Sequence, residues 1–178
     1  GTIAAASMSN GTGDLDLAYT AAAVVGKADS QSLTVSNTTA GAFTANGIET
    51  LNITSSNTAN SLASVTAAPT INVSGDTALT IAGALGTTTK TFNASAAKGA
   101  VKASFTAGAD VTATGGEGND TIDASTGNDS MVGGDGDDTF VLATAFATDL
   151  TGADVLTGGD GIDTISVNAT GAVDMVTN

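Results

Sequence analysis

Aspartate recurs on a nine-residue period in the C-terminal part of the chain. Five segments stack in register so that their fourth residue is Gly, their sixth is Asp and their eighth is apolar: 115–123, 124–132, 133–141, 149–157 and 158–166. Their Asp column is Asp120, Asp129, Asp138, Asp154 and Asp163, and a worn sixth copy, 105–113, adds Asp110. Carboxylate oxygens are hard ligands, which Ca²⁺ takes in sets of about six to eight. The spacing therefore predicts a ladder of calcium ligands.

The other positions of the repeat indicate how the chain positions those carboxylates. Positions 1 to 6 predict a turn, because Gly permits positive φ and lets the backbone pass close to an ion. Inward-facing carbonyl oxygens of this turn would join the carboxylate as ligands. Positions 7 to 9 predict a short strand whose middle side chain points into the core. An alternative is that the Asp-Gly pairs only mark hairpin turns, but that would leave the nine-residue columns unexplained.

Charge is concentrated in the same region. All four Lys and only five acidic residues lie in 1–109, whereas 110–178 holds thirteen acidic residues and no base, for a net charge of −14. An acidic block of this kind is often a solvated tail. The regular spacing of the Asp residues argues for a structured, ion-binding role instead.

The composition excludes several function classes. Without His or Cys, the chain has no Ser-His-Asp triad, thiol nucleophile or standard zinc site, and its paired carboxylates fit a metal-ligand period better than acid/base catalysis. We therefore expect no enzyme activity within these residues. The negative charge has the wrong sign for binding a phosphate backbone, so we expect no nucleic-acid partner. The longest apolar run, 21–25, is far too short for a transmembrane segment.

The motif G-G-x-G-x-D-x-U-x, complete in 115–123, 133–141 and 158–166, resembles the nonapeptide repeat of the RTX (repeat-in-toxin) family of secreted calcium-binding proteins, which form parallel β-rolls. Two repeats make one coil in that family, so turns two repeats apart share an ion. The resemblance implies that Asp120 and Asp138 bind one of several Ca²⁺ ions, and that Asp110 and Asp129 bind another on the opposite edge. The partners of Asp154 and Asp163 stay open. The backbone ligands that it implies lie near Gly116, Gly118, Gly127, Gly134, Gly136, Gly159 and Gly161.

The first half of the chain lacks the Asp code but alternates polar and apolar residues. Such runs occupy 49–54, 70–74, 78–82 and 89–94, which predicts half-buried strands. A short helix is expected only within 14–27. The predicted fold class is all-β, a right-handed parallel β-solenoid in which an ion-free β-helix, regular from about residue 35, continues into the calcium roll. We place the boundary between residues 1–104 and 105–178; a separate β-sandwich followed by a roll is the alternative.

Thr-, Ala- and Asn-rich strands that run directly into degenerate repeats resemble bacterial S-layer proteins of the RTX group. This resemblance implies type I secretion, folding on extracellular Ca²⁺, and self-association into a lattice or filament on the cell surface, where polysaccharide is a further candidate partner. Two alternatives remain open. Thr-rich faces would also suit an adhesin or an ice-binding β-solenoid, and the repeats would suit the non-catalytic export and folding module of a secreted enzyme.

Overall fold

The computed structural model describes residues 5–20, 23–26, 28–66, 68–106, 108–142 and 153–167. Within these ranges all the secondary-structure elements are β-strands. The strands are β1 (Ala6–Gly11), β2 (Leu15–Leu17), β3 (Ser30–Thr38), β4 (Ala42–Ala45), β5 (Thr50–Ser56), β6 (Asn60–Leu62), β7 (Ser64–Thr66), β8 (Thr70–Gly75), β9 (Leu79–Ile81), β10 (Thr91–Ala97), β11 (Val101–Ser104), β12 (Thr112–Thr114), β13 (Thr121–Asp123), β14 (Ser130–Asp135), β15 (Thr139–Leu142), β16 (Val155–Asp160) and β17 (Thr164–Val167).

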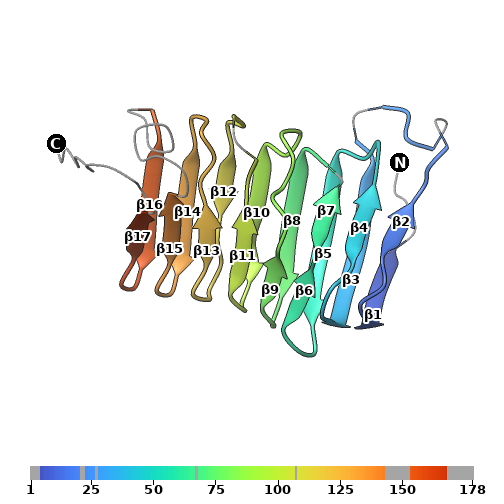
Figure 1. Cartoon of the computed structure of the whole chain (residues 1–178), viewed down its shortest axis with the longest axis horizontal. Helices are drawn as coiled ribbons and strands as arrows, with labels where there is room; N and C mark the ends of the chain where they lie inside the picture. Colours follow the sequence, from blue (N-terminus) through green and yellow to red (C-terminus); the bar gives the residue numbers. More distant parts are fainter. Residues whose placement is uncertain are drawn as a thin grey trace.

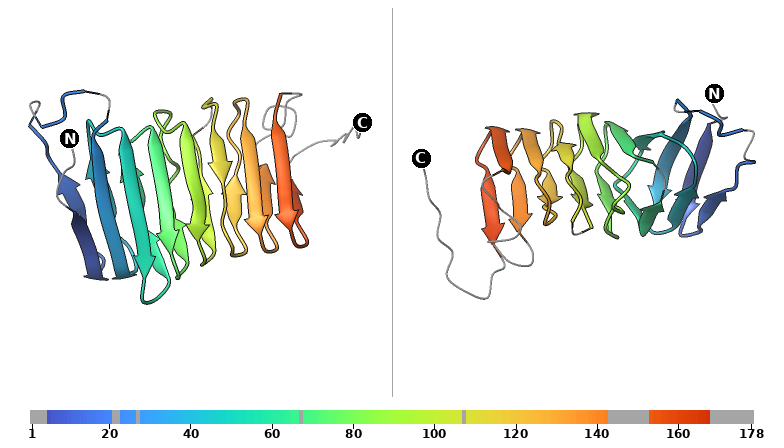
Figure 2. Two further views of the ribbon diagram at one scale, coloured as in Figure 1. Left: turned by 180° about the vertical axis from the view of Figure 1, so that it is seen from behind. Right: turned by 90° about the horizontal axis from the view of Figure 1, so that it is seen from above.

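The strands stack in parallel along one axis (Figure 1). An eight-stranded sheet has the order β1-β3-β5-β8-β10-β12-β14-β16, a six-stranded sheet has the order β17-β15-β13-β11-β9-β6, and β2-β4-β7 form a third sheet. The chain passes from one sheet to another and returns one strand further along, and each such pass is called a coil below. Two strand layers therefore face each other along the stack (Figure 2). This topology confirms the predicted parallel β-solenoid. It excludes the sandwich alternative, whose sheets are antiparallel.

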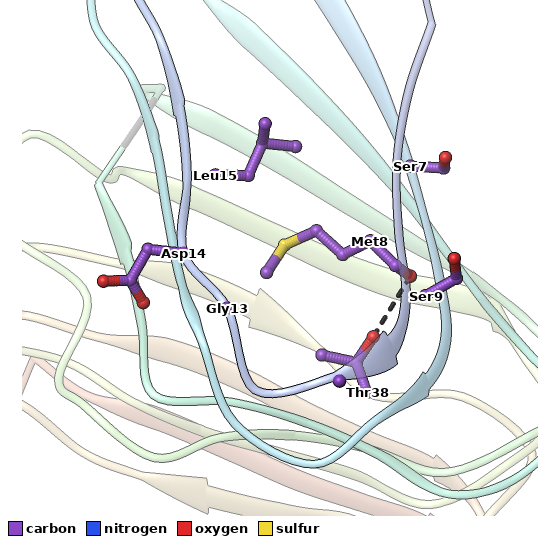
Figure 3. A pocket seen from close by; sticks show the side chains of 8 residues that line it. Ser7, Met8, Ser9, Gly13, Asp14, Leu15 and Thr38 are labelled. Carbon is purple, nitrogen blue, oxygen red and sulfur yellow. Dashed lines mark hydrogen bonds between the residues drawn. The ribbon is translucent and has the colours of Figure 1, made fainter.

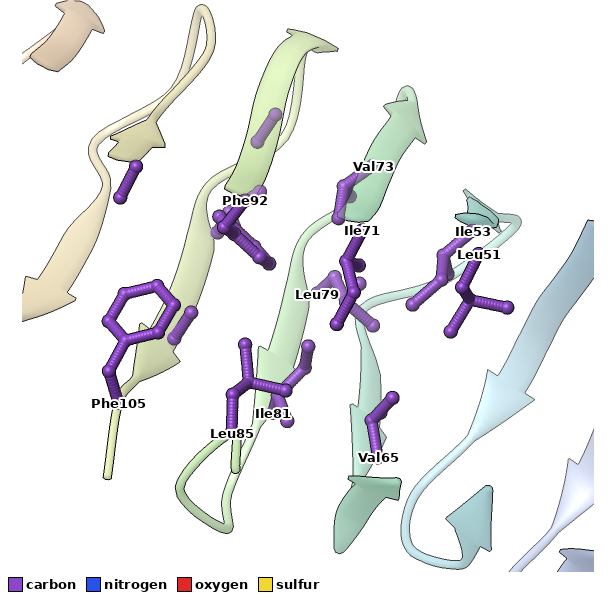
Figure 4. Packing of buried hydrophobic residues seen from close by; sticks show 14 of the residues in the cluster. Leu51, Ile53, Val65, Ile71, Val73, Leu79, Ile81, Leu85, Phe92 and Phe105 are labelled. Atoms are coloured by element: carbon purple, nitrogen blue, oxygen red, sulfur yellow. The ribbon is translucent and has the colours of Figure 1, made fainter. Parts of the chain in front are cut away.

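The core is a thin column of apolar side chains, most of them aliphatic, between the layers (Figure 4). In β5, Leu51 and Ile53 are buried and alternate with polar residues that face outward, as the two-residue period of a strand requires. Leu51 lies opposite Ile71 in β8, which lies opposite Phe92 in β10. Burial of each large aliphatic side chain stabilises the stack by about 1.5–3 kcal/mol.

Residues 14–27 do not contain the predicted helix in their described part. Leu15–Leu17 instead form β2, which pairs with β4, and the Asp14 Oδ1 atom accepts a hydrogen bond from the Ala42 backbone N–H at 2.7 Å. The cause is the Leu-Asp-Leu alternation, which places both Leu side chains against the core and so favours a strand over a helix. The coils also begin earlier than residue 35, since β1 already pairs with β3.

The large sheet continues across the boundary that we placed at residue 104, because β10 pairs with β12. The acidic repeats are therefore stacked directly on the coils formed before residue 105, whose acidic residues and Lys nearly balance and which are called the neutral coils below. Over its described residues, the chain forms no helix with the length and hydropathy needed to span a bilayer.

Candidate metal site

The turns of the roll lie along two edges. The first edge contains the turns 115–120, 133–138 and 158–163, each of which leads from the eight-stranded sheet into the six-stranded sheet. The second edge contains the turn 124–129, which leads back from β13 to β14. Because parallel coils stack in register, equivalent residues of successive turns on one edge come side by side.

Three predicted Asp residues form a ladder along the first edge. The Asp120 backbone N–H donates to the Asp138 Oδ1 atom at 2.7 Å, and the Asp138 backbone N–H donates to the Asp163 Oδ1 atom at 3.0 Å. At the start of the ladder, the Val101 backbone N–H donates to the Asp120 Oδ1 atom at 2.6 Å. The structure thus brings Asp120 and Asp138 together, and it adds Asp163, whose partner the sequence left open.

Two of the three ladder carboxylates, those of Asp120 and Asp138, are buried, which is unfavourable for their charged form. Asp120 and Asp138 are 1% and 2% exposed. Burial raises the pKa of both carboxyl groups; hydrogen bonds from the backbone lower each pKa in part, and the neighbouring ladder carboxylate raises each further. The Asp138 Oδ2 atom is buried and has no hydrogen-bond partner within the described part of the chain. A buried anionic oxygen without a partner is costly, so this atom is suited to a cation.

Glycine makes room for these carboxylates. A Cβ atom at the first residue of each first-edge turn would overlap the Oδ2 atom of the same turn's Asp; these residues are Gly115, Gly133 and Gly158. They were not among the predicted ligand positions, although the leading Gly of the motif was the signal for them. The turns therefore form cradles that exclude side chains and bring the backbone into close contact with the carboxylates.

The predicted glycines lie where successive turns touch. A Cβ atom at the second position of a turn would overlap a carbonyl oxygen of the preceding coil; the residues there are Gly116, Gly134 and Gly159. A Cβ atom at the fourth position would overlap the backbone of the preceding coil; the residues there are Gly118, Gly136 and Gly161. Gly134 and Gly136 also have φ values of 119° and 115°, which favour glycine. Carbonyl oxygens and carboxylates are consequently crowded into the same gap.

This donor set fits calcium. The described residues contain no group of three or more acidic side chains placed to hold a metal by themselves, so backbone oxygens must supply most of the ligands. Both Asp120 oxygens accept backbone N–H groups, of Val101 and Gly116, so the Asp138 Oδ2 atom is the carboxylate oxygen left for an ion. With the carbonyl oxygens of the two Gly-rich turns it offers oxygen ligands only, which is the chemistry that Ca²⁺ prefers. The unpartnered Asp138 Oδ2 atom and the side-chain-free cradle beside it are the two features that favour an ion between turns 115–120 and 133–138.

The second edge has a different arrangement. Asp129 is 2% exposed, its Oδ1 atom accepts the Val111 backbone N–H at 2.9 Å, and its own N–H donates to the Asp154 Oδ1 atom at 2.5 Å. Burial raises the pKa of Asp129, and the hydrogen bonds from Val111 and Ser125 oppose that shift. Asp154 is therefore the partner of Asp129 that the sequence left open.

The predicted pairing of Asp110 with Asp129 is wrong. Ala113 lies opposite Met131, which places Asp110 one position too early, opposite Asn128, whose backbone N–H donates to the Asp110 Oδ1 atom at 2.9 Å. Thr114, the extra residue between the two copies, causes the shift. Asp110 is exposed, whereas an apolar residue occupies the Asp column in this turn.

Ser125 is a site residue that the sequence did not single out. It replaces the second Gly of the turn 124–129, and its Oγ atom donates to the Ala109 carbonyl oxygen at 2.5 Å, lies 3.0 Å from the Asp129 Oδ2 atom and accepts the Gly127 backbone N–H at 3.0 Å. A Cβ atom at Gly127 would overlap the Ala109 carbonyl oxygen. The only available signal was the departure of Ser125 from the glycine pattern.

A pocket at the other end of the solenoid does not contribute to this site. It lies between β1 and the start of β2, where the Thr38 Oγ1 atom donates to the Met8 carbonyl oxygen at 3.1 Å (Figure 3). Its lining residues are Ser7, Met8, Ser9, Gly11, Gly13, Asp14, Leu15 and Thr38. With a single carboxylate among them, this pocket lacks the paired acidic groups of the first edge.

Comparison with known families identifies the repeats. Residues 112–142 and 149–169 match the family model of the RTX calcium-binding nonapeptide repeat in four copies. No curated protein and no solved structure matches the chain. The matched residues include the first-edge turns described above, so the repeats imply a calcium-binding β-roll module. Repeats of this type are typical of secreted proteins, and the module they form is typically structural rather than catalytic.

Proposed function

We propose that this chain is a calcium-dependent structural segment of a secreted cell-surface protein, which folds on extracellular Ca²⁺ and associates with further copies into an S-layer-type lattice or filament. The observation that carries the proposal is the ladder of Asp120, Asp138 and Asp163, in which Asp120 and Asp138 are buried and the Asp138 Oδ2 atom has no partner among the described residues. No Lys follows Lys102 in the sequence, so the chain supplies no base that would neutralise the ladder.

The ladder makes closure of the roll conditional on calcium. Inside a cell, where Ca²⁺ is scarce, the stacked carboxylates repel one another and the turns are unstable. Outside the cell, Ca²⁺ would be held by the ladder carboxylates together with the carbonyl groups near Gly116, Gly118, Gly134 and Gly136. Binding to the folded state alone then stabilises that state by mass action.

Exposed apolar side chains on the last described coil support association between copies. Val155, Ile162 and Ile165 are 55%, 79% and 39% exposed, whereas the equivalent of Ile165 in the preceding coil, Phe140, is buried. The strands of this coil, β16 and β17, also stand at the edges of their sheets. Edge strands offer unpaired backbone groups to another chain, so this end of the stack suits a contact with a second copy.

The test is folding and assembly of the chain with and without calcium. We expect circular dichroism to show strand content that falls on addition of EGTA and returns with Ca²⁺, and electron microscopy to show sheets or filaments only with Ca²⁺. Strand content that chelation leaves unchanged would contradict the calcium requirement. Monomers in saturating Ca²⁺ would contradict the lattice and leave a soluble calcium-folded module.

The outward face of the large sheet supports a second candidate, an adhesin or ice-binding surface. Thr50, Thr70, Thr91 and Thr112 lie opposite one another on successive strands, and Asn52, Asn72 and Asn93 form a parallel row beside them. Neighbouring strands are about 4.8 Å apart, so the face presents uncharged polar groups on a regular spacing. A Thr70→Tyr variant should lose adsorption to ice or to polysaccharide if this face binds either, and unchanged adsorption would exclude the face.

A further inference from the structure

The carboxylate column of the first edge continues into the neutral coils, where its residues carry no charge. Asn60 lies opposite Leu79, Leu79 lies opposite Val101, and the Val101 backbone N–H donates to the Asp120 Oδ1 atom. Asn60 therefore holds the same place in its coil as Asp120 does in the acidic part. It also makes the same ladder contact: the Thr38 backbone N–H donates to the Asn60 Oδ1 atom at 2.8 Å.

The other half of the Asn60 side chain points into a cluster of oxygen atoms. Because a backbone N–H must face an oxygen, the contact with Thr38 fixes the orientation of the amide, and the NH₂ group faces the opposite way. Asn60 is 3% exposed. The oxygens around its Nδ2 atom are the carbonyls of Val35 (3.3 Å), Ser56 (3.1 Å) and Thr58 (2.8 Å) and the hydroxyls of Ser55 (2.9 Å) and Thr77 (3.5 Å).

We propose that the Asn60 amide takes the place of a calcium ion in this coil, so that the neutral coils close without metal. This inference rests on the proposed function, in which Ca²⁺ closes the acidic turns. If Asn60 were an Asp, a carboxylate oxygen would replace its Nδ2 atom. That oxygen and the five oxygens around it would make six oxygen ligands, the lower end of the number that Ca²⁺ takes. The NH₂ group supplies positive hydrogen atoms at the position of the second carboxylate oxygen, which in Asp138 has no hydrogen-bond partner among the described residues.

On the second edge, Ser125 likewise places a side-chain hydrogen-bond donor at a position of the calcium motif. Its hydroxyl donates to the Ala109 carbonyl oxygen at 2.5 Å and lies 3.0 Å from the Asp129 Oδ2 atom, which also accepts the Ser125 backbone N–H at 3.1 Å. Both residues replace a member of the calcium motif with a side chain that donates a hydrogen bond: Asn60 stands in the Asp column, and Ser125 stands at a Gly position. The solenoid thus contains turns with an Asp ladder and turns that carry their own side-chain donor.

The test is the Asn60→Asp substitution in the full chain, with thermal unfolding and Ca²⁺ stoichiometry by calorimetry as readouts. We expect N60D to be less stable than wild type in EGTA, to recover in Ca²⁺, and to bind one more ion. Asn57→Asp is the matched control, since Asn57 is exposed in the same turn and the charge change is identical; it should add no ion. Asn60→Ala should lose stability equally in both buffers.

Three outcomes would overturn the inference while leaving the proposed function intact: a folded N60D with unchanged ion count, an N60D that Ca²⁺ does not rescue, or equal effects of N60D and N57D. A second measurement needs no variant. In wild type, the Thr38 amide should keep its hydrogen-exchange protection in EGTA, and its loss would contradict a metal-free closure. A wild-type chain that binds no Ca²⁺ would instead refute the proposed function itself.

Discussion

Replacing Asp138 by Asn separates the charge of the ladder from its shape. Asn has the same size as Asp and can keep the Oδ1 contact with the Asp120 backbone N–H at 2.7 Å. The substitution changes only the second atom, which in wild type is the buried Oδ2 oxygen without a partner in the described structure. Any effect of D138N on stability or calcium binding therefore reports the charge at that atom.

The expected effect has opposite signs with and without calcium. If the charged ligand atom contributes as much as a hydrogen bond to a charged group, about 1.5–3 kcal/mol, its loss should weaken Ca²⁺ binding at this site roughly 10- to 150-fold, since 1.4 kcal/mol is a factor of ten. Without Ca²⁺, D138N removes a buried charge that lacks a countercharge. Replacement of such a group by a neutral one is neutral or stabilising, so in EGTA the variant should unfold at the same temperature as wild type or a higher one.

Calorimetry and thermal unfolding followed by circular dichroism, each in Ca²⁺ and in EGTA, measure these two effects. Asp135→Asn is the matched control, because Asp135 is exposed in the same turn and its substitution by Asn removes the same charge. D135N should bind calcium nearly as well as wild type. Equal losses for D138N and D135N would show that only net charge matters, and a D138N variant destabilised equally in both buffers would refute the role of Oδ2 as an ion ligand.

Three further predictions test the same model. Burial raises the pKa of Asp120 and of Asp138, so the calcium-free roll should be most stable in acid, below the usual pKa of these two carboxyls, and lose that stability as the pH rises through the raised values; a urea midpoint in EGTA that rises with pH over this range would contradict this sign. Chelation should remove hydrogen-exchange protection from β12 to β17 before β3 to β10, and simultaneous loss would argue against separate calcium-dependent coils. Gly133→Ala places a methyl group against Asp138 and should cost about 1–3 kcal/mol as overpacking does, whereas Gly86→Ala, with open space around it, should change the unfolding free energy little.

The sequence was sufficient for those features of the fold that repeat locally. Alternating residues in 49–54 and 70–74 predicted β5 and β8, because each strand buries every second side chain whatever its neighbours are. The nine-residue columns likewise predicted a turn, a strand and an inward side chain such as Ile122, which is buried in β13. Both patterns follow from the geometry of single coils.

Features that depend on the register between coils were not predictable in the same way. Asp110 stands at the Asp position of the worn copy 105–113, yet the single inserted residue Thr114 moves it out of the Asp column, and only the pairing of β12 with β14 reveals this. Asn60 gave no signal, since its partners outside its own coil lie in the two neighbouring coils, Val35 and Thr38 in β3 and Thr77 in the turn after β8. A local pattern contains no information on which turn will be stacked on which.

The column that runs through Asn60, Leu79, Val101, Asp120 and Asp138 explains where calcium is needed. All five side chains are buried, and the backbone closes a coil around each of them, so the coil geometry itself does not require an ion. Leu79 and Val101 stabilise their coils through apolar burial at any calcium concentration. Asp120 and Asp138 do not supply this stabilisation by apolar burial. In the proposed function, the stability of their coils depends instead on the free Ca²⁺ concentration relative to its dissociation constant. Under the proposed function, the requirement for calcium therefore follows from the residue type at one column and is confined to the acidic coils.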